Sequence, residues 1–503
     1  MNKIFKYHEL KPIHLFVFLI LPLYLILGSS FLTVGHYWGG DFSAYIMQAE
    51  SIIDGTVQQY IEENTFTIKN TLPGLGPILY PWGYPILILP AIYILGINLW
   101  AIKAINFLFF LLFLICIYLL FVDRLSKFKL SVLLCLFAFS PLLLEAHDFI
   151  LSDIPFLFFS TLSILLIDFL IVSGQRLFSK TIDYLLLGAS IYFAFSIRQN
   201  GALLLLVLII CQIIQVFRFN RNKLFKLKPN LPDIVLSFSL VILLGVHEQL
   251  FVSDSTHIEY FLNSNYEWRY LVKFYNYLLL LPTFITNFSF NTYENLIIFL
   301  VLFPFLIAGL YLRWKSDYHF ILYSGFSLGL YLLFPSFNSR YIFPILPFYI
   351  YFVLIGMGQL GKFLDQHNLS NLQQIGYRLI ILAIIMEFAF SFTLATKNLR
   401  SKREISGPFD PTSTEMFQFV SDNTEPESIM AFFKPRVLRF FTGRNSFRAT
   451  KCKDLLSVDY LIVHKYRDHY WDSEDSLENC SPHIEFIKTF ENPNFWIYSL
   501  NKK

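Results

Sequence analysis

Long apolar runs separated by short basic clusters constrain this chain more than any other feature of its sequence. Helical stretches of about 20 apolar residues match the thickness of a bilayer. Only 15% of the 503 residues are charged, whereas a typical soluble domain carries about 25%. The sequence therefore predicts a polytopic α-helical membrane protein. The net charge of +3 is too small to favour nucleic acid as a partner.

The apolar runs predict about eleven transmembrane helices. Basic clusters such as 123–129 and 218–228 fall in every second loop, which places these loops and the N-terminus in the cytoplasm. The first run also resembles the core of a signal peptide, but its length favours a retained span. We therefore expect a multi-pass protein of the cell (inner or plasma) membrane. The predicted spans are residues 12–32, 98–122, 130–147, 151–173, 181–197, 200–217, 232–252, 293–313, 318–336, 341–360 and 377–396.

Two further apolar segments, 81–97 and 270–288, would break this alternation if they crossed the membrane. The first is short and interrupted by prolines. We therefore expect both to be interfacial or re-entrant helices on the outer side. The transmembrane domain is then 1–396, with a first outer loop at 33–80.

From 397 to 503 the composition becomes that of a soluble domain, which the alternation places outside the cytoplasm. Strands are predicted at 428–433, 459–464, 485–490 and 495–500, and a hairpin turn joins the last two. A capping box from Thr412 to Glu415 is expected to open a helix. This predicts a small extracytoplasmic α/β domain. Cys452 and Cys480 permit a disulfide there, but the sequence leaves their pairing open.

Ionisable residues gather in the outer loops. Asp41 follows two glycines and precedes an amphipathic helical pattern that includes Tyr45. A carboxylate at the membrane boundary can act as a general base. The alternative is a helix N-cap, which Asp also favours, and position alone favours the cap.

The second outer turn holds several ionisable groups within a few residues, among them His147, Asp148 and Asp153. This density at a membrane boundary favours a functional role. Asp153 could also be an N-cap, since an apolar run follows it. The mixture of imidazole and carboxylate permits a metal, but the spacing matches no zinc pattern.

Arg198 and Arg340 occupy outer turns, against the positive-inside trend. Each could extend to lipid headgroups or bind a substrate phosphate through its forked guanidinium. The long outer loop adds Arg269 and Lys273. Lys103, near the end of a predicted span, is expected to extend its ammonium to the interface. Outer carboxylates together with outer cations suit a reaction on a phosphorylated lipid.

These segments carry short motifs in a defined order and sidedness, and the resemblance that they support extends over nearly the whole chain. They resemble the GT-C superfamily of membrane glycosyltransferases, especially the bacterial branch with dolichyl-phosphate-mannose–protein mannosyltransferase-like and aminoarabinose transferase-like enzymes. The motifs are Asp-Phe-Ser-Ala-Tyr at 41–45, Tyr-Pro-Trp-Gly-Tyr-Pro at 80–85, Ser-Asp-Ile-Pro-Phe at 152–156, Arg-Gln-Asn-Gly at 198–201 and Ser-Arg-Tyr-Ile-Phe-Pro at 339–344.

The resemblance implies a catalytic role for Asp41 and a second acidic residue, Asp153, near the active site. It places Arg340 near the lipid phosphate and lets Tyr45 and Tyr84 line the cavity, and Tyr341, which follows Arg340, is a further candidate for substrate binding. Many relatives have a second acid beside the first-loop Asp, and some have basic residues after it. Here Phe42 follows Asp41, which weakens the case for a metal at that position. Phosphate contacts would then come from Arg198, Arg340, Arg269 or Lys273.

The resulting hypothesis is a glycosyltransferase that moves a hexosyl or pentosyl group from a polyprenyl-phosphate donor to a lipid, glycan or protein acceptor of the cell envelope. No cofactor is required by the sequence, although a divalent cation is compatible with it. The alternatives are a flippase for a lipid-linked sugar and a non-catalytic membrane subunit. Few ionisable residues lie at mid-membrane, where transport sites usually sit, which favours the enzyme.

Overall fold

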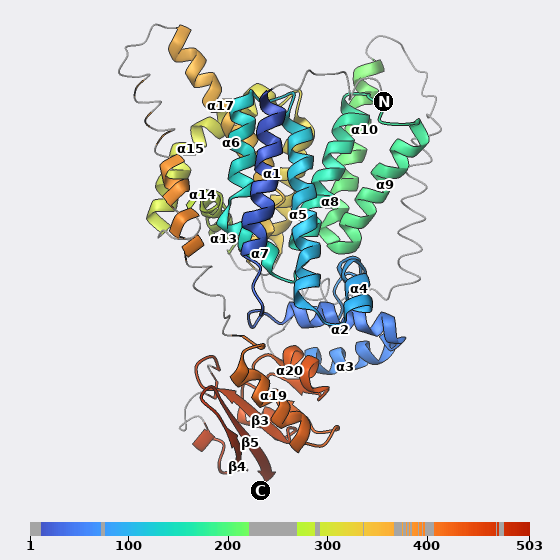
Figure 1. The fold of residues 1–503 in the computed structure, drawn as a ribbon, viewed down its shortest axis with the longest axis vertical. Coiled ribbons are helices and arrows are strands. Elements are labelled where there is room, and N and C mark those ends of the chain that lie inside the picture. The colour runs from blue at the N-terminus through green and yellow to red at the C-terminus, as the bar shows by residue number, and fades with distance from the viewer. Residues whose placement is uncertain are drawn as a thin grey trace.

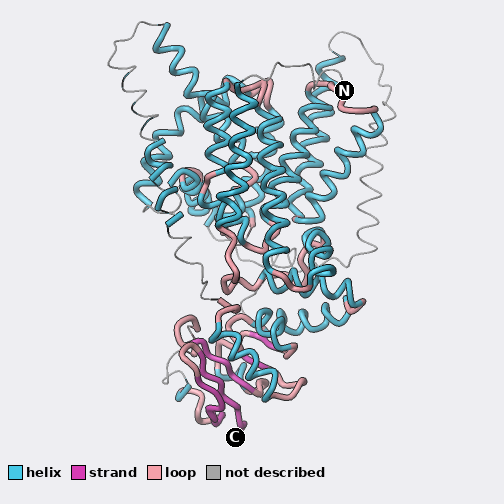
Figure 2. Tube along the Cα trace, viewed as in Figure 1, coloured by secondary structure: helices cyan, strands magenta, loops and turns pink. Residues whose placement is uncertain are grey.

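The computed structural model describes residues 12–71, 76–220, 269–286, 292–334, 337–366, 407–468, 470–471 and 477–503, with single residues and short pieces between 375 and 397. A bundle of helices forms one end of the molecule and a smaller domain with a sheet forms the other (Figure 1). Among the described residues, all strands belong to the smaller domain (Figure 2).

The bundle consists of long apolar helices, as the runs in the sequence predict. Within the described residues, four helical segments are long and apolar enough to cross a membrane, or five if one bent pair counts as a single span. The predicted span 232–252 and parts of 377–396 lie outside the described residues, so the described part of the chain does not yield the expected eleven. The bundle helices are α1 (Pro12–Ser30), α5 (Leu99–Phe121), α6 (Lys127–Ala138), α7 (Pro141–Asp148), α8 (Asp153–Leu166), α9 (Lys180–Ile197), α10 (Ala202–Asn220), α15 (Thr292–Arg313), α16 (Tyr318–Leu333) and α17 (Leu346–Gln366).

The span predicted at 130–147 is not one straight helix. It is divided into α6 and α7, which meet at an angle of 43°. Pro141 is the first residue of α7, and a proline cannot continue a preceding helix because it lacks an N–H and its ring clashes with the turn before it. Similarly, the run predicted at 341–360 begins with a 3₁₀ turn, η3 (Ser339–Ile342), and the α-helix starts only at Leu346.

Small residues let the bundle helices approach closely. A Cβ at Gly309 of α15 would collide with the carbonyl of Phe352, and one at Gly356 of α17 would collide with the carbonyl of Phe305. Close backbone contact of this kind is a main source of helix association in lipid, where burial of apolar surface gives little driving force. Gly83 makes the same kind of contact with the backbone of Ser196.

Three helices lie between the bundle and the smaller domain (Figure 1). They are α2 (Asp41–Asp54), α3 (Val57–Asn70) and α4 (Gly83–Leu95). Helix α4 has 13 residues, a length of about 20 Å, which is less than the roughly 30 Å of a hydrocarbon core. The second segment expected at the interface contains α13 (Arg269–Leu280) and the short α14 (Thr283–Thr286). The interfacial placement of both segments stays a prediction.

The smaller domain contains a five-stranded sheet with the order β2-β1-β3-β5-β4. Each of the four predicted strands contains or overlaps an observed one, and β2 is an additional short strand. The hairpin of β4 and β5 is antiparallel, as expected. The strands are β1 (Met430–Ala431), β2 (Ser446–Phe447), β3 (Tyr460–His464), β4 (Ile484–Glu491) and β5 (Phe495–Lys502), and the helices are α19 (Pro411–Asn423), α20 (Pro435–Thr442) and α21 (Cys452–Leu455).

The expected capping box at Thr412 is wrong. Asp410 is the N-cap of α19, and its carboxylate accepts a hydrogen bond of 2.8 Å from the backbone N–H of Ser413. Pro411 takes the first helical position, where its missing N–H costs nothing. Thr412 therefore lies inside the helix.

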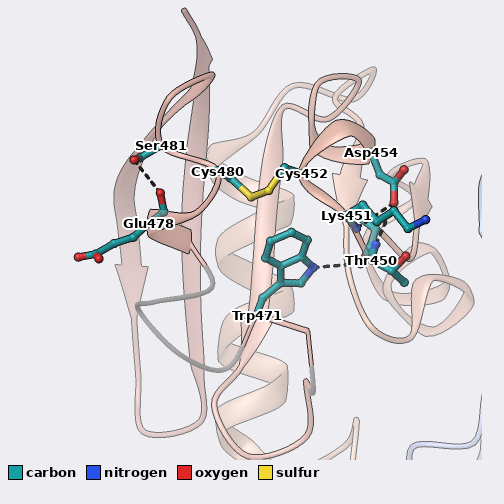
Figure 3. Close-up of a disulfide and its surroundings, with 9 residues drawn as sticks. Thr450, Lys451, Cys452, Asp454, Trp471, Glu478, Cys480 and Ser481 are labelled. Carbon is teal, nitrogen blue, oxygen red and sulfur yellow. Dashed lines mark hydrogen bonds between the residues drawn. A yellow bond between two sulfur atoms is a disulfide. The ribbon is translucent and has the colours of Figure 1, made fainter.

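A disulfide joins Cys452 of α21 to Cys480 across 28 residues (Figure 3). Trp471 lies beside it, and its indole N–H donates to the carbonyl of Ala449 at 3.0 Å. The bridge and the indole belong to a buried cluster on one side of the sheet. The three remaining cysteines, Cys116, Cys135 and Cys211, are free thiols in bundle helices.

Candidate active site

The structure brings Asp41 and Asp153 together through one arginine. Nη1 of Arg340 lies 2.9 Å from Oδ2 of Asp153, and Nη2 of the same guanidinium lies 3.7 Å from Oδ2 of Asp41. Arg198 pairs with the other oxygen of Asp153. Four residues predicted separately from distant parts of the sequence thus form one cluster of two carboxylates and two guanidinium groups.

Asp41 is the first residue of α2, but its side chain does not turn back onto the helix. Gly40 occupies the N-cap position. Oδ1 of Asp41 accepts a hydrogen bond of 2.8 Å from the hydroxyl of Tyr80, and Oδ2 faces Arg340. About 34% of the Asp41 side chain remains exposed. These contacts argue against the capping interpretation, and the exposed part of the side chain can be reached by another molecule.

Asp153 is also the first residue of its helix, α8, with Ser152 at the N-cap. Its side chain is only 4% exposed, and both oxygens are engaged by guanidinium groups. Asp153 therefore joins Arg198, at the C-terminal end of α9, to Arg340 in η3. Asp153 holds the pKa of Arg340 above its usual range, so this guanidinium stays charged.

Arg340 is held by its own turn as well. The side chain of Asn338 accepts hydrogen bonds from the backbone N–H of Arg340 at 3.1 Å and from its Nε at 3.3 Å. Three quarters of the Arg340 side chain is buried. A guanidinium has five N–H donors in a rigid fork, so the cluster retains donors for a further anion.

Tyrosines form the wall next to Asp41. The rings of Tyr45 and Tyr80 are 4.6 Å apart, and those of Tyr45 and Tyr84 are 4.8 Å apart. The hydroxyl of Tyr45 donates to Ser152 at 3.0 Å. Burial raises the pKa of Tyr45, so its hydroxyl stays protonated.

A narrow pocket lies beside the arginines, and with the side chains as they stand it is too narrow for a water molecule. The guanidinium of Arg198 lies 5.5 Å from the centre of the Tyr341 ring, and Tyr341 stacks on Tyr331. Aromatic faces and guanidinium groups together can accept an anionic group attached to an apolar chain. The pocket is lined by Asp153, Phe156, Arg198, Asn200, Tyr331, Arg340, Tyr341, Phe343 and Pro344.

Asp148 has contacts of a different kind. It forms a fully buried ion pair of 2.8 Å with Lys103, whose ammonium also donates to the carbonyls of Thr33 and Gly35. The expectation that Lys103 extends to the interface is therefore wrong, because its side chain is 0% exposed. This pair fixes the start of the first outer loop to α5 and α7.

His147 is packed inside the bundle. Its Nε2 lies 3.2 Å from the carbonyl oxygen of Gly28, and its ring contacts Tyr24 and Phe107. On these contacts His147 supports helix packing around α1. A role for His147 or Asp148 in substrate binding stays untested, and we do not include them in the proposed site.

The two basic residues of the long outer loop lie on α13. Arg269 is its first residue, and the side chain of Arg269 is outside the described part of the structure. Lys273 donates to the carbonyl of Phe334 at 2.7 Å. This contact holds α13 against the segment that leads to Arg340.

Sequence reasoning missed the contribution of the soluble domain. Arg436 of α20 donates to the hydroxyl of Tyr80 at 3.2 Å, and Tyr80 in turn contacts Asp41. Trp38 of the first outer loop is buried in an aromatic cluster of the soluble domain. The rings around it are those of Phe417, Phe432, Phe433, His464 and Phe495. The sequence carries a signal there, because the segment 429–436, which ends in Lys-Pro-Arg, also fits the resemblance to the GT-C superfamily, but it does not indicate a contact with Tyr80.

The cluster does not fit a divalent cation. Both oxygens of Asp153 are occupied by arginines, and Phe42, which follows Asp41, has no ligand atom to offer. Among the described residues, no three His, Cys, Asp or Glu side chains gather as ligands. We therefore derive no step through a metal.

Comparison with known proteins identifies the fold. No protein-family model and no curated protein matches the sequence. Among solved structures, ArnT from Cupriavidus metallidurans in the apo state is similar with a TM-score of 0.61 and 12% identity, over 96% of this chain and 97% of ArnT. The same protein bound to undecaprenyl phosphate gives a TM-score of 0.57 at 12% identity over the same shares of both chains.

The archaeal oligosaccharyltransferase AglB from Archaeoglobus fulgidus, solved with an inhibitory peptide and a dolichol-phosphate, gives a TM-score of 0.54. It is 11% identical over 95% of this chain and 74% of AglB. ArnT and AglB are both GT-C proteins, and the resemblance inferred from the motifs is thus confirmed at the level of the fold. The fold is that of a polytopic membrane protein with a C-terminal soluble domain.

Proposed function

We propose that this protein is a glycosyltransferase that moves a sugar from a polyprenyl-phosphate donor to an acceptor at the outer face of the membrane. The observation that carries this proposal is the Asp41–Arg340–Asp153–Arg198 cluster at the end of the membrane bundle. It combines an accessible carboxylate with guanidinium groups in a single site. The similarity to ArnT solved with undecaprenyl phosphate and to AglB solved with dolichol-phosphate supports a lipid-linked donor.

In the proposed reaction, an acceptor hydroxyl attacks the anomeric carbon of the donor sugar. A new carbon–oxygen bond forms as the bond from the anomeric carbon to the phosphate oxygen breaks. The carboxylate of Asp41 takes the proton of the attacking hydroxyl. The electron pair leaves with the polyprenyl phosphate. Direct displacement of this kind inverts the anomeric configuration.

The leaving group gains negative charge, so it needs cations rather than an acid. Arg340 is mostly buried and is kept charged by Asp153. A preorganised guanidinium in a partly dry site stabilises developing charge without reorganisation. Arg198, on the other side of Asp153, presents a second guanidinium to the same pocket. Asp153 acts here by positioning both arginines.

The position of the site agrees with this substrate class. The cluster lies where the bundle meets α2, and the soluble domain lies beyond it (Figure 1). A phosphate at Arg340 would therefore leave its prenyl chain along the apolar helices and its sugar toward the soluble domain. The acceptor that receives the sugar in the assay shows whether the enzyme uses a lipid, a glycan or a protein.

The experiment is sugar transfer by the purified protein in proteoliposomes, with a panel of polyprenyl-phosphate sugars and cell-envelope acceptors. Wild type is compared with Asp41→Asn and with Asp54→Asn, a control at the exposed far end of the same helix. We expect turnover by wild type, a loss of about a hundredfold or more in Asp41→Asn, and little change in Asp54→Asn. Equal turnover in Asp41→Asn and wild type would remove Asp41 from catalysis.

A further inference from the structure

Helix α20 of the soluble domain inserts two arginines into the first outer loop. Arg436 and Arg439 are 2% and 3% exposed. Both donate to the side-chain oxygen of Asn64 in α3, at 3.2 Å and 3.1 Å. Arg439 also donates to Thr67 at 3.2 Å. Two buried guanidinium groups of the soluble domain thus donate hydrogen bonds to polar side chains of α3.

Of these two arginines, Arg436 is the one whose described contacts extend to the proposed site. Its Nη1 donates to the hydroxyl of Tyr80 at 3.2 Å, and its guanidinium carbon lies 5.3 Å from the centre of the Tyr80 ring. The hydroxyl of Tyr80 donates to Oδ1 of Asp41 at 2.8 Å. Arg436 is itself fixed by Asn64 and by the carbonyl of Pro77. A continuous hydrogen-bonded path therefore runs from the soluble domain to Asp41.

Which group donates in each of these hydrogen bonds follows from the number of hydrogens that each group carries. A tyrosine hydroxyl has one hydrogen to donate and can also accept. A guanidinium has no acceptor, so Arg436 can only donate to Tyr80. The single hydrogen of the hydroxyl then points to Asp41. Arg436 holds the phenol oxygen from the other side, so without Arg436 the Tyr80–Asp41 hydrogen bond would be held in place less firmly.

We propose that Arg436 of the soluble domain is a positioning residue that acts through Tyr80 to orient the Asp41 carboxylate, so that the site is complete only when the soluble domain is docked. With Oδ1 held by Tyr80, Oδ2 faces Arg340 and the space where an acceptor would lie. The effect on turnover rests on the proposed function. The effect on the carboxylate itself does not.

Docking of the domain has its own anchor, separate from this path. Trp38 is 4% exposed and lies among aromatic rings of the soluble domain, 5.1 Å from Phe433 and 5.9 Å from Phe432. Because this anchor remains when Arg436 is replaced, loss of the guanidinium should disturb Asp41 without releasing the domain. The structural and positioning roles of α20 can therefore be separated.

The test compares Arg436→Gln, Tyr80→Phe, their double variant and Arg439→Gln. Arg439→Gln is the matched control. Arg439 lies on the same helix face and is equally buried, but its described contacts do not include Tyr80. Arg436→Lys serves as the conservative variant, because an ammonium keeps the charge and can donate to the hydroxyl. Steady-state kinetics give kcat and KM, and a protease digest reports docking of the domain.

We expect Arg436→Gln and Tyr80→Phe each to lower kcat about 10- to 100-fold, the scale of a misplaced catalytic group, with KM changed less than threefold. The double variant should lose no more than either single variant, because both break the same path. Arg436→Lys should recover part of the loss. Arg439→Gln should keep kcat within about threefold. Equal losses in Arg436→Gln and Arg439→Gln, or multiplying losses in the double variant, would overturn the proposal.

A second measurement does not depend on turnover. Asp41 is labelled with a water-soluble carbodiimide and an amine, and the peptide is quantified by mass spectrometry with Asp41→Asn as the blank. Labelling should be at least threefold faster in Arg436→Gln and Tyr80→Phe than in wild type and Arg439→Gln. If wild type transfers no sugar but labelling follows this pattern, the proposed function fails and the positioning role stands. Unchanged labelling in Arg436→Gln would overturn the role.

Discussion

Replacement of Asp153 by asparagine should destabilise the bundle and misplace both arginines. In the native protein, each carboxylate oxygen faces one guanidinium, Arg198 on one side and Arg340 on the other. Asparagine keeps one acceptor oxygen, but its NH₂ group turns N–H donors toward the second guanidinium. The variant therefore loses an ion pair and leaves a partly buried charge without compensation.

The magnitude follows from burial. Removing one partner of a buried ion pair costs about 3–5 kcal/mol. The side chains of Arg198 and Arg340 are 22% and 25% exposed, so water can partly replace the lost oxygen. We therefore expect the lower end, about 3 kcal/mol, which is roughly a 150-fold change in the folded-to-unfolded ratio. For a chain of this length that corresponds to a fall in Tm of about 3 °C.

The assay uses the chain's own thiols. Cys116, Cys135 and Cys211 are free and lie in bundle helices, so a thiol-reactive fluorophore reports unfolding of the bundle during heating. The control is Asp183→Asn. Asp183 is also buried, but its carboxylate accepts hydrogen bonds from the backbone N–H groups of Leu177 and Phe178 and has no arginine partner among its described contacts. A Tm for Asp153→Asn that equals wild type, or falls no more than the control, would refute the argument.

Three further outcomes follow from the structure. Replacing Cys452 and Cys480 by serine removes the link that closes a loop of 28 residues. The free energy of unfolding of the soluble domain should fall by about 3.5 kcal/mol. The Tm of the variant should lie below that of wild type without reductant and equal it when reductant is present. Burial lowers the pKa of His464 from 6.5 to about 4, so the unfolded chain takes up this proton at a higher pH than the folded protein. The free energy of unfolding should therefore fall as the pH drops from 6.5 to 4, by roughly 1–2 kcal/mol at pH 5. His464→Gln should reduce this loss in the same thermal assay. Gly309→Leu should abolish monodisperse protein on size exclusion because its Cβ meets a backbone carbonyl, whereas Gly325→Leu, with open space at that position, should not.

The sequence predicted those parts of the fold that depend on local pattern. Apolar runs are local, and they became helices wherever the structure describes them. Asp41, Asp153, Arg198 and Arg340 were identified because each is a polar residue at the outer end of a helix, and such ends meet at one face of a bundle. Position alone favoured a helix cap for Asp41, and the resemblance to GT-C enzymes was needed to predict that these residues share one site.

Contacts between distant segments could not be predicted in the same way. Arg436 and Tyr80 are separated by 356 positions, and nothing local to either residue indicates the other. The role of Lys103 was misjudged for a similar reason, since its partner Asp148 and the carbonyls of the first loop are brought to it only by tertiary packing. The break at Pro141, by contrast, was present in the sequence as a proline inside an apolar run.

The central claim is that Asp41 activates an acceptor hydroxyl for direct displacement of a polyprenyl phosphate. The most direct test is the anomeric configuration of the sugar in the product of the wild-type enzyme, compared with the donor by NMR, with Asp41→Asn as the blank. We expect an inverted configuration and no product from the blank at the same time point. A retained configuration would contradict it, because retention needs a second displacement through a covalent intermediate.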